Sequence, residues 1–410
     1  MPITAPNNAG LDSAKLTLLD STKLTLLDTI ATNAIKNGAI PGCVLLVVKN
    51  GKIAYHKAFG HYTYQALQPT TITTVYDLAS VTKICATTLA VMKLYDEGKI
   101  NLKKTIGDYL PWVKQSNKAG LVIEKLLLHQ AGLVPFIPFY KELIDAEGNP
   151  LPQYFSVKPT DSFNVQVAYK MYLKNTWQDT MYSRILQSPL TTAEKYVYSD
   201  NDFIFLAKIV EAIAGMPLND YVQKEFYTPL SLISTTFSPL KKISVQNIAP
   251  TENEKIFRQQ QIQGFVHDPG AAMFGGVAGH AGLFSNAYDI AVIMQMLLNG
   301  GEINGKRYLQ QATVNLFTAY SSNVSRRGLG FDKPEKDNAT RKETYPSKYV
   351  STQTFGHTGF TGTCTWADPL NNIVFVFLSN RVQPTSENNK LSHLHVRAAL
   401  QDAVYKALVK

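Results

Sequence analysis

The sequence predicts an α/β protein of the α+β type, with one central antiparallel sheet built from both ends of the chain. Three observations lead to this prediction. Apolar runs with the length of buried strands gather near both termini, as at Cys43 to Val48 and Ile373 to Leu378. Stretches of helical periodicity fill the middle. Amphipathic stretches close both ends, so we expect terminal helices to cover the sheet and a mainly helical part to be inserted between its strands.

The first elements are a helix and a hairpin. Residues 15–37 contain the hexapeptide Lys-Leu-Thr-Leu-Leu-Asp twice and then further apolar residues, and Gly38 is a stop signal, so we expect an amphipathic helix. Two strand-like runs follow within residues 41–59, separated by Asn50-Gly51. Asn-Gly between two such runs is a strong signal for a β-hairpin.

The next segment, residues 78–95, is predicted to be a helix that carries reactive groups at its start. Its apolar residues recur at roughly helical spacing, and Gly98 supplies a stop. Ser80 and Lys83 are three residues apart, so they share one face of a helix. A buried lysine can take the proton of a serine hydroxyl, since desolvation lowers the pKa of an amine. This S-x-x-K pattern is typical of acyl-transfer enzymes.

The middle and the end of the chain are predicted from the same periodicity signals. Residues 135–195 are rich in tyrosine, proline and polar residues with little periodicity, so we expect an irregular lobe that could wall a cleft. We expect helices over residues 203–215 and 287–298, with a glycine-rich loop over 275–282 between them. Strands are expected over 354–359, 363–368 and 373–378, and an amphipathic helix closes the chain. We expect residues 1–80 and 300–410 to form the sheet part, residues 81–299 the helical part, and the active site to lie between them.

Composition limits the classes of function. The 410 residues carry a formal charge of +9, but the lysines are scattered and no nucleic-acid-binding motif accompanies them, so we expect no nucleic-acid partner. No apolar run approaches the ~18 residues that span a bilayer. Three cysteines provide neither a disulfide framework nor metal-type spacing, and the histidines lack metal-type spacing as well. We therefore expect no metal site. The first residues show no basic region followed by an apolar core, so no signal peptide is visible.

Four stretches together resemble the serine β-lactamase and penicillin-binding-protein superfamily: residues 78–83, Tyr198-Ser199-Asp200-Asn201, the glycine-rich loop, and His357-Thr358-Gly359. The resemblance covers residues from about 39 to about 380 and points to the branch that includes class C β-lactamases, D-alanyl-D-alanine carboxypeptidases and related esterases. It implies a β-lactamase/transpeptidase-like fold and no cofactor. It also implies Ser80 as the nucleophile, Lys83 and Tyr198 as the groups that move protons, and the backbone N–H groups of Ser80 and Phe360 as the oxyanion hole.

Two positions depart from the family pattern. Asp200 stands where Tyr-x-Asn would place asparagine, with Asn201 one residue later. In the other register, residues 199–201 match the Ser-Asp-Asn of class A enzymes, but no class A glutamate motif follows. His357 stands where β-lactamases usually have lysine, and with a reference pKa near 6.5 it would be a weak anchor for a substrate carboxylate. The expected substrate-binding residues are Asp200, Asn201, His357, Thr358, Gly359 and Phe360.

The sequence thus predicts a serine hydrolase that forms an acyl-enzyme at Ser80 and acts on an amide or ester. Candidate substrates are a cell-wall peptide, a β-lactam or a small ester, with a carboxylate as the expected recognition group. The alternative is a noncatalytic relative that binds cell-wall peptide or modulates a partner. The family usually works outside the cytoplasm, so we expect a periplasmic or cell-surface location. We predict no oligomeric state.

Overall fold

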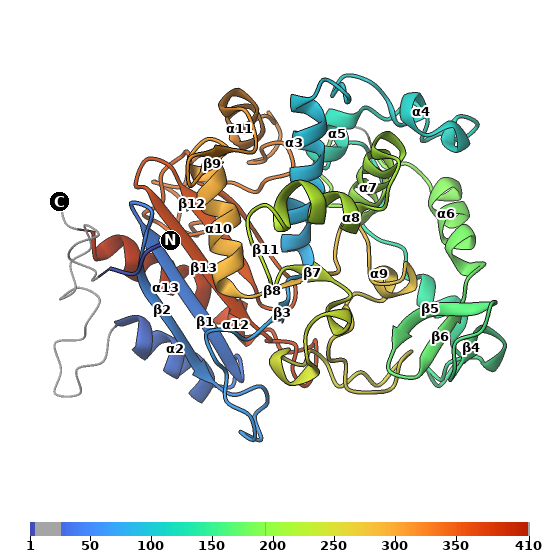
Figure 1. Ribbon diagram of the computed structural model, residues 1–410, viewed down its shortest axis with the longest axis horizontal. Coiled ribbons are helices and arrows are strands. Elements are labelled where there is room, and N and C mark those ends of the chain that lie inside the picture. Colours follow the sequence, from blue (N-terminus) through green and yellow to red (C-terminus); the bar gives the residue numbers. More distant parts are fainter. Residues whose placement is uncertain (5–25, 193, 409–410) are drawn as a thin grey trace.

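The core of the protein is a five-stranded antiparallel sheet in the order β11-β12-β13-β1-β2 (Figure 1). The computed structural model describes residues 1–4, 26–192 and 194–408. The strands are β1 (Gly42–Lys49), β2 (Lys52–Gly60), β11 (Phe355–Thr358), β12 (Cys364–Asp368) and β13 (Ile373–Ser379). The sheet therefore joins the two ends of the chain, which confirms the predicted fold class.

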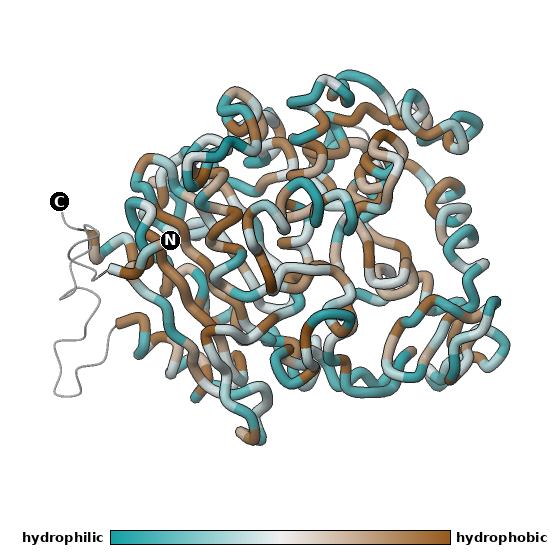
Figure 2. Tube along the Cα trace, in the orientation of Figure 1, coloured by the Kyte–Doolittle hydropathy of each residue, from teal (hydrophilic) through white to brown (hydrophobic). Residues whose placement is uncertain are grey.

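Both faces of this sheet are buried, because its apolar residues alternate between two cores. In β1, Val44, Leu46 and Val48 belong to the larger hydrophobic cluster, whereas Cys43, Leu45 and Val47 belong to the smaller one. Helices α2 (Leu26–Lys36) and α13 (Val396–Lys406) pack together over the smaller cluster. Figure 2 shows the hydrophobic stretches that follow the strands of the sheet.

Helix α10 (Ala287–Leu298) covers the opposite face, where it contacts β1, β12 and β13 (Figure 1). The expected boundary at residue 299 places this helix in the helical part, but its packing argues for grouping it with the sheet. The other predicted elements near the N-terminus agree with the structure. The β1–β2 hairpin turns at Asn50 and Gly51, whose φ angles of 53° and 74° suit such a turn. The expected helix is confirmed over Leu26–Lys36, and its residues 15–25 lie outside the described residues.

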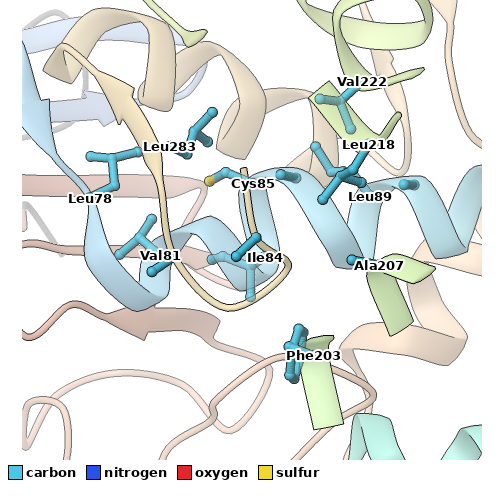
Figure 3. Packing of buried hydrophobic residues seen from close by; sticks show 14 of the residues in the cluster. Leu78, Val81, Ile84, Cys85, Leu89, Phe203, Ala207, Leu218, Val222 and Leu283 are labelled. Carbon is cyan, nitrogen blue, oxygen red and sulfur yellow. The ribbon is translucent and has the colours of Figure 1, made fainter. Parts of the chain in front are cut away.

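The helical part is organised around the segment that contains Ser80. This segment begins as a 3₁₀ turn (η2, Ala79–Val81), continues as a π-helix (η3, Lys83–Thr88) and ends as the α-helix α3 (Leu89–Asp96). Its apolar side chains, among them Val81, Ile84 and Leu89, are fully buried against neighbouring elements that include α7 (Figure 3). π-helical turns are often found at functional sites. The predicted helical segment is confirmed, with a local geometry that the periodicity did not indicate.

The remaining elements surround this chain. The α-helices are α4 (Ile106–Tyr109), α5 (Ile123–Leu127), α6 (Trp177–Gln187), α7 (Asp200–Ala214), α8 (Leu218–Val222), α9 (Pro269–Met273), α11 (Gln311–Thr318) and α12 (Lys390–His393). The short strands are β3 (Tyr76–Asp77), β7 (Thr236–Phe237), β8 (Leu283–Ser285), β9 (Glu302–Ile303) and β10 (Lys306–Arg307). Further 3₁₀ or π turns are η4 (Pro111–Val113), η5 (Phe139–Leu143), η6 (Pro152–Tyr154), η7 (Gln223–Tyr227), η8 (Pro239–Lys241) and η9 (Val245–Asn247). No helix among the described residues has the length and apolar character needed to cross a membrane.

The expectation of an irregular lobe that could wall a cleft over residues 135–195 is right in one part and wrong in the other, since residues 136–140 line the cleft but the region is not irregular throughout. This region contains a three-stranded sheet of β4 (Phe155–Ser156), β6 (Met171–Lys174) and β5 (Phe163–Ala168), followed by helix α6. The signal was present but weak. Val165 and Val167 alternate with polar residues in β5, and Trp177, Met181 and Ile185 are the buried residues of α6 at helical spacing. The turn between β5 and β6 contains Lys170 at φ 50° rather than glycine, so no turn signal marked the hairpin.

Candidate active site

Ser80 lies in a tightly held turn between the sheet and the helical part. The residue before it, Ala79, has φ 46°, a conformation that costs a non-glycine residue about 1–3 kcal/mol. The buried carboxylate of Asp77 holds this turn by accepting hydrogen bonds from the Ala79 N–H (2.8 Å) and the His267 N–H (2.6 Å). The surrounding structure therefore fixes the backbone that presents the Ser80 hydroxyl.

Lys83 is fully buried, and its ammonium group has a hydrogen-bond acceptor for each of its three protons. It donates to Ser80 Oγ (2.9 Å), to Asp200 Oδ1 (2.7 Å) and to the backbone carbonyl of His280 (3.2 Å). The last contact comes from the glycine-rich loop. This loop passes so close to α7 that a Cβ at Gly279 would lie 2.0 Å from the Phe203 carbonyl oxygen, so only glycine fits there.

The structure corrects the expectation that burial leaves Lys83 without its charge. Burial by itself lowers the pKa of Lys83, but the carboxylate of Asp200 and the hydroxyl of Tyr198 raise it by more, so its pKa lies above the usual value. Lys83 is therefore an ammonium ion in the resting protein. The departure from asparagine at position 200 is a direct cause, because asparagine carries no charge.

Tyr198 contacts Ser80, as the Tyr-x-Asn reading of residues 198–200 predicts. Its hydroxyl donates to Ser80 Oγ at 2.9 Å, and its ring centroid lies 4.8 Å from Lys83 Nζ. The class A register does not fit the structure, because the Ser199 hydroxyl donates to the Val134 carbonyl at 2.6 Å and also caps α7. Asn201 is buried and its Nδ2 donates to the same carbonyl at 2.9 Å. Its amide therefore holds a loop, although the residue borders the cleft.

The pKa of the Tyr198 hydroxyl lies above its usual value of 10. Burial is the largest cause, and the Asp200 carboxylate adds to it, whereas the charges of Lys83 and Arg327 act in the opposite direction. Ser80 Oγ thus accepts two hydrogen bonds from groups that both hold their protons. The resting site therefore stabilises negative charge on this oxygen.

His357 does not titrate near neutral pH, contrary to the sequence-based expectation. It is buried, and burial together with the nearby Arg327 lowers its pKa to about 3. Its Nδ1 lies 2.7 Å from the Thr358 carbonyl and its Nε2 lies 3.1 Å from Arg327 Nη1. These contacts suit a neutral ring that donates from Nδ1 and accepts at Nε2. His357 therefore offers no positive charge to a substrate carboxylate.

Sequence reasoning missed Arg327, which is the fixed cation behind the site. This residue is 3% exposed, its guanidinium carbon lies 5.4 Å from the centroid of the Tyr198 ring, and its Nη2 donates to the Tyr196 hydroxyl at 2.9 Å. Asp332 lies 3.7 Å from its Nε. The pair Arg326-Arg327 lies in a loop with no motif around it, so nothing in the local sequence marked it.

The end of β11 lies directly against the turn that carries Ser80. A Cβ at Gly359 would lie 2.4 Å from the Leu78 carbonyl oxygen, so this position needs glycine. The Thr361 hydroxyl donates to the Asp77 carbonyl (2.7 Å) and the Thr363 hydroxyl to the Leu78 carbonyl (3.0 Å). These contacts set the backbone of Phe360 beside that of Ser80. Thr358 is partly exposed at the strand end.

A cleft of about 920 Å³ opens over these groups and is lined by Ser80, Tyr198, Asp200 and Phe360, among others. Within the described part of the chain, the one set of side chains with metal-type proximity is Asp200, Asp268 and His280, whose ligand atoms lie within 4.8 Å of one another. Asp200 is already paired with Lys83, and Asp268 with His280 Nε2 at 2.9 Å. These side chains are therefore part of an internal hydrogen-bonded network that includes the Lys83 ammonium.

Comparison with known proteins places this site in a family. Residues 27–400 match the model of the Beta-lactamase family. The chain belongs to that family. It is 36% identical over 393 residues to a protein of Escherichia coli K12 named provisionally as a D-alanyl-D-alanine carboxypeptidase, covering 89% of this chain and 84% of that relative. The chain is therefore a serine hydrolase of the β-lactamase-related type, and it has the β-lactamase/transpeptidase-like fold.

Solved structures support the same fold at lower identity. EstCE1, described as a hydrolase with promiscuous acyltransferase activity, is 22% identical, with a TM-score of 0.65 over 93% of this chain and 97% of that one. A class C β-lactamase from Rhodobacter sphaeroides is 17% identical, with a TM-score of 0.64 over 93% and 99%. At these identities the likeness concerns the fold alone.

Proposed function

We propose that Ser80 is the nucleophile of an acyl-transfer reaction that hydrolyses esters and amides through an acyl-enzyme. One observation carries the proposal: Ser80 Oγ lies 2.9 Å from both Lys83 Nζ and the Tyr198 hydroxyl, inside the large cleft. Nucleophile and proton-moving groups within hydrogen-bond reach are the geometric requirement of this chemistry.

In the proposed reaction, Tyr198 acts in its ionised form and takes the proton of Ser80 as Oγ attacks the carbonyl carbon. Tyr198 then returns that proton to the leaving alcohol or amine, and a water molecule releases the acyl group by the same route. Lys83 stays charged and stabilises both the phenolate and the developing alkoxide. The backbone N–H groups of Ser80 and Phe360 would receive the oxyanion, a contribution worth about 10²–10³ in rate for one donor.

Neutral substrates fit this site better than anionic ones. The reference pKa of histidine already makes His357 a weak anchor for a substrate carboxylate, and in the structure its pKa is lower still and its Nε2 faces Arg327. We therefore propose small esters and uncharged amides as better substrates than β-lactams or carboxypeptidase substrates, which carry a carboxylate. Cell-wall peptides are the second candidate, suggested by the name of the provisionally named carboxypeptidase of Escherichia coli. A periplasmic or cell-surface location belongs to the same proposal, because such peptides lie outside the cytoplasm.

Covalent labelling of Ser80 tests the proposal. A fluorophosphonate and a fluorescent penicillin are incubated with the wild type and with Ser80→Ala, and the labelled peptide is identified by mass spectrometry. We expect label on Ser80 in the wild type and none in the variant. Label that persists in Ser80→Ala, or a wild type that neither labels nor hydrolyses nitrophenyl esters, refutes the proposal. Thermal unfolding of the variant serves as the control for folding.

A further inference from the structure

The cleft is lined by both polar and apolar side chains. Four of its five acidic side chains have a side-chain partner: Glu252 lies 2.8 Å from His267 Nε2, Asp268 lies 2.9 Å from His280 Nε2, Glu254 pairs with Arg258, and Asp200 pairs with Lys83. The fifth, Glu387, is exposed, as is Lys255, the lysine that lines the cleft. Most of the acidic lining is therefore already engaged within the protein, and the two exposed groups carry one charge of each sign.

The apolar side chains of this lining form what we call the apolar wall, and several of them are open to solvent. Three large side chains line the cleft while remaining exposed: Phe136 (64%), Ile256 (52%) and Phe360 (54%). Single exposed apolar residues are normal on a protein surface, but several that border one concave site mark a binding surface. The same wall includes Ile137 and Tyr140, both partly buried.

The part of the apolar wall at Phe136 is fixed to the start of α7. The Val134 carbonyl accepts hydrogen bonds from the Ser199 hydroxyl and from Asn201 Nδ2, and the Asp200 N–H donates to the Pro135 carbonyl at 2.8 Å. The segment that leads into Phe136 is therefore tied to the start of α7, next to Tyr198. This arrangement gives Asn201 a positioning role that the sequence did not suggest.

Phe360 is also held in place although half of it is exposed. Its ring stacks with the His267 ring at a centroid distance of 5.7 Å, and the Arg381 guanidinium carbon lies 4.4 Å from its centroid. Arg381 Nε additionally donates to the Phe360 carbonyl at 2.7 Å. An aromatic ring that is both oriented and exposed beside the nucleophile can cover an apolar group without a large loss of side-chain entropy.

We propose that Phe136, Ile256 and Phe360 form a subsite for an uncharged apolar group, aromatic or medium-chain alkyl, attached to the scissile ester or amide. This inference rests on the proposed function and names the substrate class of the same site. The cleft volume of about 920 Å³ lies within the range of sites that enclose small-molecule ligands.

Two ester series test the subsite and show which side of the scissile bond occupies it. In one series, nitrophenyl esters carry acyl chains from acetate to octanoate; in the other, acetate esters carry alcohols of increasing length. A fully buried methylene contributes about fourfold in binding, so in this open cleft we expect kcat/KM to rise about twofold to fourfold per methylene along one series. A flat or falling profile in both series overturns the inference but leaves the proposed function intact.

Matched variants locate the effect. Phe136→Ser and Ile256→Ser are expected to lower the octanoate-to-acetate ratio of kcat/KM by at least threefold each, or the corresponding alcohol ratio if that series rises. Ile233→Ser is the control, because Ile233 is 84% exposed and does not line the cleft. Loss of the gradient in this control, or a full gradient in both cleft variants, overturns the inference. If the wild type hydrolyses no ester and Ser80 takes no label, the proposed function fails and the inference fails with it.

Discussion

Asp200→Asn is expected to increase activity at neutral pH, although it changes a residue in direct contact with Lys83. In the wild type, the Asp200 carboxylate lies 2.7 Å from Lys83 Nζ and raises the pKa of both Lys83 and Tyr198. Asparagine keeps a hydrogen-bond acceptor at this position and removes the charge. The Tyr198 phenolate, which we propose as the base, then forms at a lower pH.

The size of the effect follows from the geometry. The Lys83 ammonium lies 4.8 Å from the Tyr198 ring centroid, a separation at which two unit charges interact by about 3.5 kcal/mol at an effective dielectric constant of ~20. The Asp200 carboxylate, 2.7 Å from the same ammonium, offsets part of this stabilisation of the phenolate. We therefore expect its removal to lower the pKa of Tyr198 and to favour the phenolate by about 1–2 kcal/mol.

The assay is the pH profile of kcat/KM with a neutral nitrophenyl ester. Below the pKa of the base, the rate is proportional to the ionised fraction, so this change in free energy raises kcat/KM about tenfold at a fixed pH near 7. Asp220→Asn, in the first turn of α8, makes the same charge change outside the cleft and is the control. A folded Asp200→Asn protein with unchanged or lower activity at pH 7 refutes this electrostatic reasoning.

Three further outcomes follow from the same electrostatics. Arg327→Met removes a cation 5.4 Å from the Tyr198 ring centroid, so it should move the acid limb of kcat/KM to higher pH and lower kcat/KM severalfold near pH 7. Arg326→Met is the control: Arg326 also binds the Asp332 carboxylate, and its removal should leave the limb in place. Because the pKa of His357 is about 3, the ratio of rates for anionic and neutral esters should stay constant through about pH 6.5, and a drop there would show that the ring is charged. Because the pKa of Asp332 is lowered from 3.8 to about 2, the ionised carboxylate adds about 2 kcal/mol to the free energy of unfolding. This stabilisation is present above pH 3.8 and is lost as the pH falls through 2, so the free energy of unfolding measured by urea titration should depend less on pH over that interval in Asp332→Asn than in the wild type.

The local sequence determined the elements and most of the residues that meet in the cleft. Alternating and helical periodicities are local properties, so the strands at both ends, the Asn50-Gly51 hairpin and the helix after Ser80 could be predicted. The spacing of Ser80 and Lys83 places them together in any helix. The hairpin over residues 163–174 was missed because its turn lacks the usual residues.

Only the tertiary structure decided the charges of the site. The pKa of Lys83 depends on Asp200, which lies 117 residues away along the chain. The neutrality of His357 depends on burial and on Arg327, a residue with no motif around it. Asn201 turned out to hold the Val134 loop because α7 begins beside that loop. Electrostatic interactions depend on groups that are close in space but distant in sequence. Sequence patterns could therefore indicate the candidate reacting groups but not their protonation states.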